Sequence, residues 1–427
     1  MEKENEIKTV IPVLRFPEFI KTKGWEIILI GNIGETYGGL TGKNKTDFGY
    51  GEKYVTYKQV YNNSSVNIAH CDFVCINSSE KQNLVKFGDI LFTQSSETPE
   101  EVGISSVMLN ETNEAIYLNS FCFGLRPFDL KKISPHFSKY LFRSQIFRDR
   151  IIPLAQGITR FNISPTKFKT IKIPIPTSTY NDEENTEQQK IADCLSSLDD
   201  LIEATAQKVE TLKEHKKGLM QRLFPAEGKD VPDLRFPEFQ GQATEWQSTL
   251  LGAVVDYENG RAHENEIDDE GDFIVVNSKF ISTDGEVVKR TNTPYCLADK
   301  EDILMVLSDV PNGRAIAKCF FVDQSGVYTV NQRICRLRSK NVNSKLLFYL
   351  INRNPYFLSF DDGVKQTNLK KSEVLECPLM IPSSPKEQKK ITDLLSSIDD
   401  LIIATEQRIK SLEKHKKGLM QQLFPKI

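Results

Sequence analysis

No stretch of this chain is apolar over enough residues to cross a membrane. The apolar runs of the chain, such as Ile-Leu-Met-Val-Leu at residues 303–307, are far shorter than the roughly 20 residues that a spanning helix needs. The first residues, Met-Glu-Lys-Glu-Asn-Glu, are mostly charged and no hydrophobic segment follows them, which argues against a signal peptide. We therefore expect a cytoplasmic protein without a membrane anchor.

The sequence also lacks a cysteine framework and an excess of basic residues. Its 8 cysteines show no regular spacing, as in proteins of a reducing compartment. His70, Cys71 and Cys75 have no second ligand pair at zinc-finger spacing, so we predict no metal site. The formal charge of −3 does not exclude DNA as a ligand, because phosphate binding needs only a local basic face. Composition thus leaves a globular protein of two or three domains.

What the chain does contain is a long internal duplication. Residues 187–225 return as residues 387–425 with 26 of 39 positions identical, and both copies end in His-Lys-Lys-Gly-Leu-Met-Gln-x-Leu-Phe-Pro. A second duplicated element, Leu14-Arg-Phe-Pro-Glu-Phe19 and Leu234-Arg-Phe-Pro-Glu-Phe239, opens each half. The regions between these elements differ, and the period is too long for a solenoid repeat. A repeated framework with varied inserts predicts two different recognition surfaces on one scaffold.

Each copy of the duplicated block has the pattern of a long helix. Apolar residues recur at alternating steps of four and three over residues 191–223 and 391–423, interrupted at the same two steps by threonine and lysine. Two helices with the same seam are expected to pack on each other. The alternative, in which each helix covers only its own domain, has the same periodicity and stays open at this point.

The ends and one interior position of each helix carry further signals. Thr186 with Gln189 fits a capping box, and Pro385 suits the first helical position of the second copy. Gly218 and Gly418 lie inside the helical pattern, where glycine costs up to about 1 kcal/mol relative to alanine. A close helix crossing, a partner contact or a frayed last turn would each explain this glycine.

The inserts, residues 20–180 and 240–382, have the pattern of mixed α/β domains. Strands are predicted at residues 53–57, 89–93, 272–276 and 302–306, and helices at 137–148 and 344–352. Four landmarks recur in the same order: Gly38-Gly39 with Gly260, Thr56-Tyr-Lys58 with Asn277-Ser-Lys279, Phe87-Gly-Asp89 with Lys300-Glu-Asp302, and Gly157-Ile-Thr-Arg-Phe-Asn162 with Gly363-Val-Lys-Gln-Thr-Asn368. We therefore predict one fold, used twice with different surface residues.

A fixed order of motifs runs through both halves. Leu-Arg-Phe-Pro-Glu-Phe is followed by Trp25 or Trp246, an Ile-Gly or Leu-Gly step, a variable α/β region, and Glu-Gln-x-Lys-Ile-x-Asp-x-Leu-Ser-Ser. This order resembles the specificity subunit of type I restriction-modification systems, over essentially the whole chain. The duplicated helical block is the most specific part of the resemblance.

The resemblance implies an α+β protein in which two similar mixed α/β target-recognition domains are joined by two long helices that form an antiparallel coiled coil. It places the recognition domains at residues 1–186 and 226–386 and the spacer helices at 187–225 and 387–427. It further implies that the domains read the two halves of a split, asymmetric site in double-stranded DNA. Its expected partners are two methyltransferase subunits and restriction/translocase subunits. S-adenosylmethionine, ATP and Mg are expected only in those partners.

Side chains suited to DNA occur at equivalent places in both inserts. Base edges are read by Arg, Lys, Asn, Gln, Ser and Thr, and phosphates attract Lys and Arg. In the first insert the candidates are Thr41, Lys43, Lys45, Lys58, Gln94, Ser95, Ser96, Arg160 and Asn162. In the second they are Arg261, His263, Asn277, Lys279, Asn312, Arg314, Lys365, Gln366 and Asn368. Any one of them could instead be a solvated loop side chain.

The repeated His-Lys-Lys motif is the candidate partner surface. It comprises His215, Lys216 and Lys217 in the first helix and His415, Lys416 and Lys417 in the second. A solvated basic helix end, favoured by the helix dipole, is the alternative. No catalytic triad or acid-base arrangement can be assembled from the sequence, so we predict a non-catalytic subunit.

Two functions remain in competition. The first is a sequence-specific DNA-binding subunit that positions methyltransferase and restriction subunits. The second is a non-enzymatic coiled-coil adaptor whose inserts bind protein rather than DNA, which the near-neutral charge leaves open.

Overall fold

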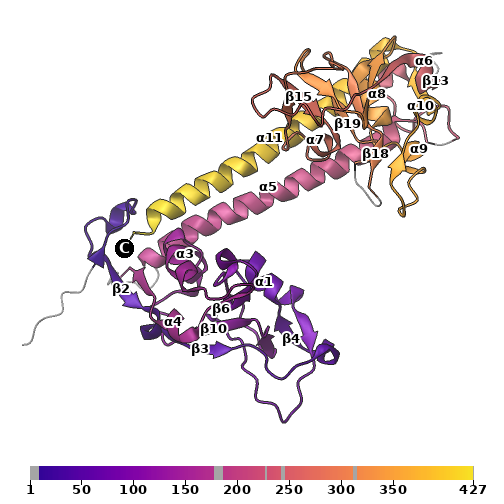
Figure 1. The fold of residues 1–427 in the computed structure, drawn as a ribbon. Coiled ribbons are helices and arrows are strands. Elements are labelled where there is room, and N and C mark those ends of the chain that lie inside the picture. The colour runs from indigo at the N-terminus through magenta and orange to yellow at the C-terminus, as the bar shows by residue number, and fades with distance from the viewer. Residues whose placement is uncertain (1–8, 177–185, 227, 242–245, 311–314, 427) are drawn as a thin grey trace, which may run out of the picture. The chain divides into compact units, whose positions relative to one another are not determined.

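The computed structural model describes residues 9–176, 186–226, 228–241, 246–310 and 315–426 (Figure 1). The chain divides into two compact units: unit 1 comprises Met1–Gln207 and Glu406–Ile427, and unit 2 comprises Lys208–Thr405. Each unit therefore contains one α/β region and part of each long helix. The four segments expected from the sequence are distributed over these two units.

Two long helices carry the duplicated block. Helix α5 (Glu187–Leu223) begins in unit 1 and ends in unit 2, and helix α11 (Pro385–Leu423) begins in unit 2 and ends in unit 1. The Thr186 hydroxyl accepts a hydrogen bond from the Gln189 backbone N–H at 3.1 Å, as the capping box predicts. The Gln189 side chain does not complete that box. It donates to Asp193 instead, at 2.7 Å.

Within each unit the two helix segments run antiparallel. In unit 1, Ile191 and Leu195 near the start of α5 share one hydrophobic core with Leu423 at the end of α11. In unit 2, Leu223 at the end of α5 shares a core with Ile391 and Leu395 near the start of α11. Equivalent positions of the two helix copies thus make equivalent core contacts in the two units. Packing of the two seams on each other is confirmed within each unit.

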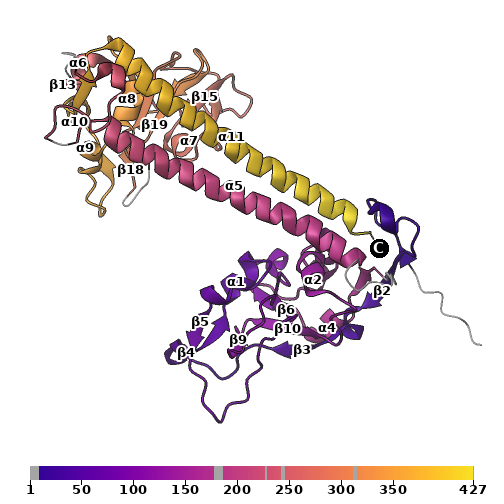
Figure 2. The same cartoon turned by 180° about the vertical axis from the view of Figure 1, so that it is seen from behind.

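The lysine that interrupts the seam has a structural partner in both units. In unit 2, Lys216 Nζ lies 2.5 Å from Asp399, which also accepts the Tyr349 hydroxyl at 2.7 Å. In unit 1, Lys416 pairs in the same way with Asp199, which accepts the Tyr140 hydroxyl at 2.8 Å. Lys416 belongs to α11 and Asp199 to α5, the two long helices whose ribbons are labelled in Figure 2. A single polar seam residue with one matching partner selects one register of a coiled coil, at some cost in stability.

The electrostatic environment of Asp199 agrees with this arrangement. Burial alone would raise the pKa of Asp199. Hydrogen bonds from Lys416 and Tyr140, together with the charges of Lys416 and Lys139, outweigh burial and hold that pKa below its ordinary value. Asp199 is therefore an anion over the physiological pH range and remains a partner for the lysine.

A buried ion pair fastens the Leu-Arg-Phe-Pro-Glu-Phe element to the start of a long helix in each unit. Arg15 donates to both carboxylate oxygens of Glu187 at 2.7 Å. Arg235 makes the same bidentate contact with Glu387, at 2.7 and 2.8 Å. Both carboxylates are 1% exposed. Because the guanidinium fork matches the carboxylate, these pairs define where each α/β region attaches to its helices.

The described residues of unit 1 form four small sheets and four short α-helices. The first sheet has the strand order β1 (Thr9–Val10), β2 (Trp25–Leu29), β12 (Lys172–Ile175), and the second has the order β3 (Gly34–Gly38), β10 (Cys122–Pro127), β6 (Ile90–Thr93), β8 (Ser105–Val107). The third sheet has the order β5 (Asp72–Val74), β4 (Phe48–Val55), β9 (Ile116–Leu118), and the fourth pairs β11 (Phe161–Asn162) with β7 (Ser95–Ser96). The helices are α1 (Tyr57–Asn62), α2 (Pro135–Leu141), α3 (Gln145–Ile151) and α4 (Pro165–Lys169).

Unit 2 repeats this topology. The first sheet pairs β13 (Trp246–Leu250) with β23 (Pro378–Pro382), and the second has the strand order β14 (Val255–Asn259), β21 (Ile334–Ser339), β17 (Ile303–Val306), β19 (Cys319–Phe321). The third sheet has the order β16 (Arg290–Thr291), β15 (Phe273–Val276), β20 (Tyr328–Val330), and the fourth pairs β18 (Ser308–Asp309) with β22 (Thr367–Asn368). The helices are α6 (Leu251–Val254), α7 (Ser278–Ser282), α8 (Ser344–Ile351), α9 (Pro355–Leu358) and α10 (Lys371–Leu375). The sheet β5-β4-β9 of unit 1 and the sheet β16-β15-β20 of unit 2 each contain one parallel pair, β4 with β9 and β15 with β20. One fold used twice is therefore confirmed.

One local prediction needs correction, and one question left open by the sequence narrows. The stretch 137–148 is two helices rather than one, because α2 ends at Leu141 and Ser144 caps a new helix, α3, by accepting from the Phe147 N–H. Of the three explanations left open for Gly218 and Gly418, a close helix crossing is not seen among the described residues of either unit. Among the described residues, nothing beyond its own helical turn lies within 4 Å of where a Cβ on either glycine would be.

No helix in the described part of the chain is both long enough and apolar enough to span a bilayer.

The Arg235–Glu387 pair is expected to dominate the attachment in unit 2. Arg235→Ala leaves a buried carboxylate without its partner, which should lower the free energy of unfolding of unit 2 by about 3–5 kcal/mol. Trp246 belongs to the core of unit 2 and Trp25 to that of unit 1, so Trp246 fluorescence in a Trp25→Phe background reports the urea transition of unit 2. As a control, Lys389→Ala removes only an exposed pair with Asp393 and should cost less than about 0.5 kcal/mol. Equal urea midpoints of Trp246 fluorescence for the two variants would contradict the role assigned to the Arg235–Glu387 pair.

Candidate nucleic-acid interface

In each unit, side chains that can donate or accept hydrogen bonds or carry a positive charge lie together at one place, here called its recognition corner. The corner combines the first turn of a short helix (α1 or α7), a two-stranded pairing (β7–β11 or β18–β22) and the turn before the central strand (β10 or β21). In unit 1 it contains Lys58, Ser95, Phe121, Arg160 and Asn162; in unit 2 it contains Lys279, Ser308, Arg333, Gln366 and Asn368. Both sets come from segments far apart in the sequence.

In unit 1 the corner is closed by backbone pairing. Strand β7 pairs antiparallel with β11, which places Asn162 opposite Ser95 and Phe161 opposite Ser96. The Gln94 N–H donates to the Phe121 carbonyl at 2.8 Å, and the Gln94 carbonyl accepts from Ile163 at 3.1 Å. The sequence candidates 94–96, 160 and 162 are therefore brought together. Ser95 and Ser96 are buried, whereas Arg160 and Asn162 are exposed.

Aromatic rings support the exposed arginine of unit 1. The Arg160 guanidinium carbon lies 4.7 Å from the ring centroid of Phe121, a cation–π geometry. Nearby, the rings of Tyr57 and Tyr61 stack 6.3 Å apart on helix α1. Burial raises the pKa of Tyr57 to about 12, while the charge of Arg160 acts in the opposite direction. Tyr57 thus remains a neutral hydroxyl beside the cation.

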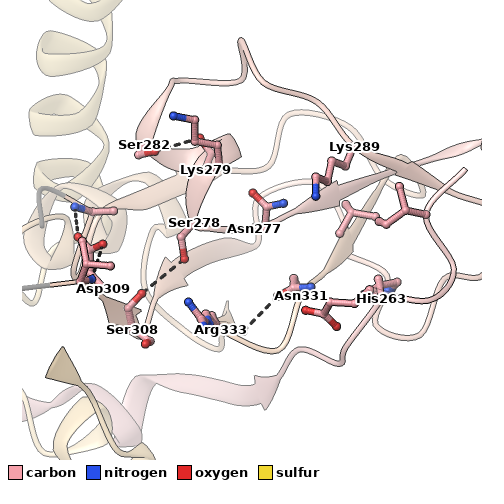
Figure 3. A pocket seen from close by; sticks show the side chains of 15 residues that line it. His263, Asn277, Ser278, Lys279, Ser282, Lys289, Ser308, Asp309, Asn331 and Arg333 are labelled. Carbon is pink, nitrogen blue, oxygen red and sulfur yellow. Dashed lines mark hydrogen bonds between the residues drawn. The ribbon is translucent and has the colours of Figure 1, made fainter. Parts of the chain in front are cut away.

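In unit 2 the corner opens into a polar hollow of about 710 Å³. Figure 3 shows Asn277, Ser278 and Lys279, from the start of α7, facing Ser308, Asn331 and Arg333 across it. The Ser278 hydroxyl lies 3.5 Å from the Ser308 carbonyl, and Gln366 Nε2 donates to the Ser308 hydroxyl at 2.8 Å. These contacts join α7, β18 and β22 around one space.

Three cations and two carboxylates, Glu264 and Asp309, line this hollow, so positive charge is in slight excess there. Lys279, Lys289 and Arg333 line the hollow and form no ion pair with a carboxylate among the residues that the structure describes. The Asp309 carboxylate, by contrast, accepts backbone N–H groups from Val310, Ala315 and Ile316 at 2.7–3.2 Å. Its charge is therefore partly compensated by the backbone, and the cations remain available.

The two corners share one backbone and differ in side chains. The Asn119 side chain accepts from the Phe121 N–H at 2.9 Å, and the Asn331 side chain stands in the same relation to the Arg333 N–H at 3.5 Å. The Phe121 carbonyl accepts from Gln94, and the Arg333 carbonyl accepts from Leu307 at 2.9 Å. Phe121 and Arg333 are thus equivalent positions.

Two further sequence landmarks are confirmed as equivalent. Thr56 and Asn277 are the N-caps of α1 and α7, which makes Lys58 and Lys279 equivalent exposed residues of their first turns. Asp89 accepts two hydrogen bonds from Arg126, and Asp302 accepts two from Arg338.

Three candidates of unit 1 lie outside the corner as defined. Thr41 hydrogen-bonds Gln82 through its backbone N–H. Lys43 Nζ contacts the Cys75 carbonyl and Glu80, both at 2.6 Å, and is almost fully buried. Hydrogen bonding to Lys43 lowers the pKa of Glu80 to about 2. Lys43 therefore has a structural role, whereas Lys45 is exposed.

The remaining candidates of unit 2 differ in exposure. Arg261 and Lys365 are exposed, and the Arg261 backbone N–H donates to Val330 at 3.0 Å. His263 lines the hollow but is itself buried, with Nε2 3.1 Å from the Thr329 hydroxyl. Its Nδ1 has no hydrogen-bond partner among the described residues. Asn312 and Arg314 lie outside the described residues.

Sequence reasoning missed Phe121, Lys289, Ser308 and Arg333. A signal existed for Phe121 and Arg333, because each is the second residue after an asparagine and precedes a strand that contains Leu-Arg (Leu125-Arg126 and Leu337-Arg338). Aligning the two inserts on that pair would have placed Phe121 and Arg333 together.

The His-Lys-Lys motif divides into two kinds of residue. Lys216 and Lys416 point into the helix seam and bind Asp399 and Asp199. His215, Lys217, His415 and Lys417 are exposed. In unit 1, Lys416 and Lys417 line a hollow of about 400 Å³ together with Arg143, Asp199 and Met420.

Comparison with known proteins decides the family. A model of the type I restriction modification DNA specificity domain matches residues 22–214 and again residues 243–414. The chain belongs to this family. Both matches include an α/β insert and most of the long helix that follows it, so the duplicated block is part of the family pattern.

Relatives within the family cover between 67% and 95% of this chain. The StySPI specificity subunit of Salmonella potsdam is 24% identical over 432 residues, covering 95% of this chain and 88% of its own length. The MjaVIII specificity subunit of Methanocaldococcus jannaschii is 26% identical over 305 residues, covering 67% and 69%. The crystal structure of an S subunit from M. genitalium superposes with a TM-score of 0.56 at 18% identity, covering 98% of this chain and all of that one. The fold is therefore that of a type I specificity subunit.

Proposed function

We propose that this specificity subunit reads a split, asymmetric site in double-stranded DNA, with each recognition corner reading one half. The observation that carries the proposal is the duplicated corner. One backbone arrangement presents Phe121 and Arg160 in unit 1 but Arg333 and Gln366 in unit 2. Because base pairs are distinguished by the donors, acceptors and methyl groups they show in the major groove, different side chains select different sequences.

The first test is the response of binding to salt. Lys58→Gln and Lys279→Gln should each reduce the slope of log K against log salt by about 0.9, because each removes one phosphate contact. Binding of the subunit, assembled with its co-expressed methyltransferase partner, is measured on a specific and a scrambled duplex from low to moderate salt.

Lys389→Gln, an exposed helix residue paired with Asp393, serves as the control and should leave the slope unchanged. Equal affinity for the two duplexes at every salt concentration would contradict DNA reading and favour an adaptor that binds protein.

We further propose two methyltransferase subunits, one for each copy of the helix motif. His215, Lys217 and Gly218 of α5 have the same exposure as His415, Lys417 and Gly418 of α11. The space beside each glycine supports this proposal, since a partner backbone could approach there closely. Restriction/translocase subunits would complete the enzyme. Catalysis, with S-adenosylmethionine, ATP and Mg, would belong to the partners, in the cytoplasm.

Alanine at the two helix glycines separates folding from partner binding. Gly218→Ala and Gly418→Ala should each stabilise the isolated chain by up to about 1 kcal/mol, because alanine favours the helix and meets no described neighbour. The same changes should weaken association with the methyltransferase, each at one of two sites. Urea unfolding and the stoichiometry of the co-purified complex measure the two effects. Two partners bound with unchanged affinity in the double variant would exclude this surface.

Because α5 and α11 each pass from one unit to the other, we propose that their length sets the gap between the half-sites. Inserting one heptad next to Gln207 in α5 and next to Gln407 in α11 preserves the seam and lengthens both helices by about 10 Å. The gap should grow by about three base pairs, while both half-site sequences remain the same. Sequencing of methylated positions in cellular DNA gives gap and half-sites together. Changed half-site bases at an unchanged gap would contradict the spacer role.

A further inference from the structure

Most arginines of the two α/β regions are held by internal acceptors. Arg126, Arg336 and Arg338 bind carboxylates, and Arg143 and Arg148 bind backbone carbonyls. This changes at the two recognition corners, and also at Arg261 outside them. Neither the Arg160 nor the Arg333 guanidinium has a carboxylate or carbonyl acceptor among the described residues, and both side chains are exposed.

These two arginines lie in the equivalent corners of units 1 and 2 but come from segments that are not equivalent. Arg160 belongs to the loop that leads into β11, and its guanidinium packs on Phe121. In unit 2 the equivalent of Phe121 is Arg333 itself, and the equivalent of Arg160 is Gln366, two residues before Asn368 as Arg160 is before Asn162. Each corner therefore keeps one arginine although the position that supplies it has changed.

The surroundings of both arginines suit a base edge better than a phosphate. Arg160 lies against an aromatic ring, which limits the freedom of its planar fork before any ligand binds. Arg333 borders a hollow whose other side chains include Asn277, Ser278 and Asn331, groups that can hydrogen-bond to bases (Figure 3). A phosphate contact would require neither a supporting ring nor a polar hollow.

We propose that Arg160 and Arg333 are the guanine-reading residues of the two units, each donating in the major groove to O6 and N7 of a guanine in its half-site. This inference rests on the proposed reading of DNA by the corners. It adds that both half-sites contain a G·C pair, and that each pair is read by a different arginine.

The test uses the subunit in complex with its methyltransferase partner and the site found by sequencing methylated DNA from cells that express the system. Each guanine of the site is replaced in turn by 7-deazaguanine, which lacks the N7 acceptor. Wild-type binding should weaken at one guanine in each half-site. Arg160→Ala should weaken binding by about 5- to 100-fold and abolish the effect of 7-deazaguanine in the first half-site only. Arg333→Ala should do the same in the second half-site only, so each variant is the matched control for the other.

Phe121→Leu provides a second variant that keeps the arginine. Removing the ring beneath the guanidinium should cause a smaller loss, confined to the first half-site. The proposal is overturned if either half-site contains no guanine, or if the arginine variants respond to 7-deazaguanine as the wild type does. It is also overturned if they weaken specific and scrambled duplexes equally and lower the salt slope, as phosphate contacts would. Failure of DNA reading itself would appear differently, as no preference of the wild-type complex for its own site.

Discussion

The antiparallel packing of the α5 and α11 segments is the constraint on which each unit depends. Each α/β region contributes to a core that also contains the start of one long helix and the end of the other. The helix segments are thus part of the domain core rather than an appendage to it. The buried Arg15–Glu187 and Arg235–Glu387 pairs fix the attachment, and breaking one would leave a desolvated charge inside the unit. Neither α/β region is expected to be stable without both helix segments.

Repetition of this arrangement follows from the repeated sequence. Lys216 meets Asp399 in unit 2, and Lys416 meets Asp199 in unit 1. A parallel or shifted pairing would leave these partly buried charges unmatched. The polar interruption of the seam, which weakens the coiled coil locally, thereby selects one alignment. The retention of lysine at both positions has a structural cause, while His215 and His415 beside them are exposed and form no ion pair among the described residues.

The long helices and the duplicated fold could be predicted from the sequence. The residues that form the recognition corners could be predicted only in part. Helical periodicity sustained over many turns is a strong signal, and the ends of both helices followed from Thr186 and Pro385. Repeated landmarks surround Lys58, Arg160 and Asn162, which is why the sequence singled them out as candidates. Arg333 was missed because it aligns with a phenylalanine, and Lys43 was overrated because its ion pair with Glu80 joins distant segments. Composition and spacing do not reveal such tertiary partners.

The way each corner is held explains how one fold can carry two specificities. The turn before the central strand is fixed by asparagine side chains and backbone groups: Asn119 and Asn331 accept from the following turn, and Gln94 and Leu307 donate to it from the neighbouring strand. These bonds do not involve the side chains of Phe121 and Arg333. Exchange at such exposed positions usually changes stability by only about 0.5 kcal/mol or less. The residues proposed to contact bases can therefore vary between units while the backbone that presents them stays the same.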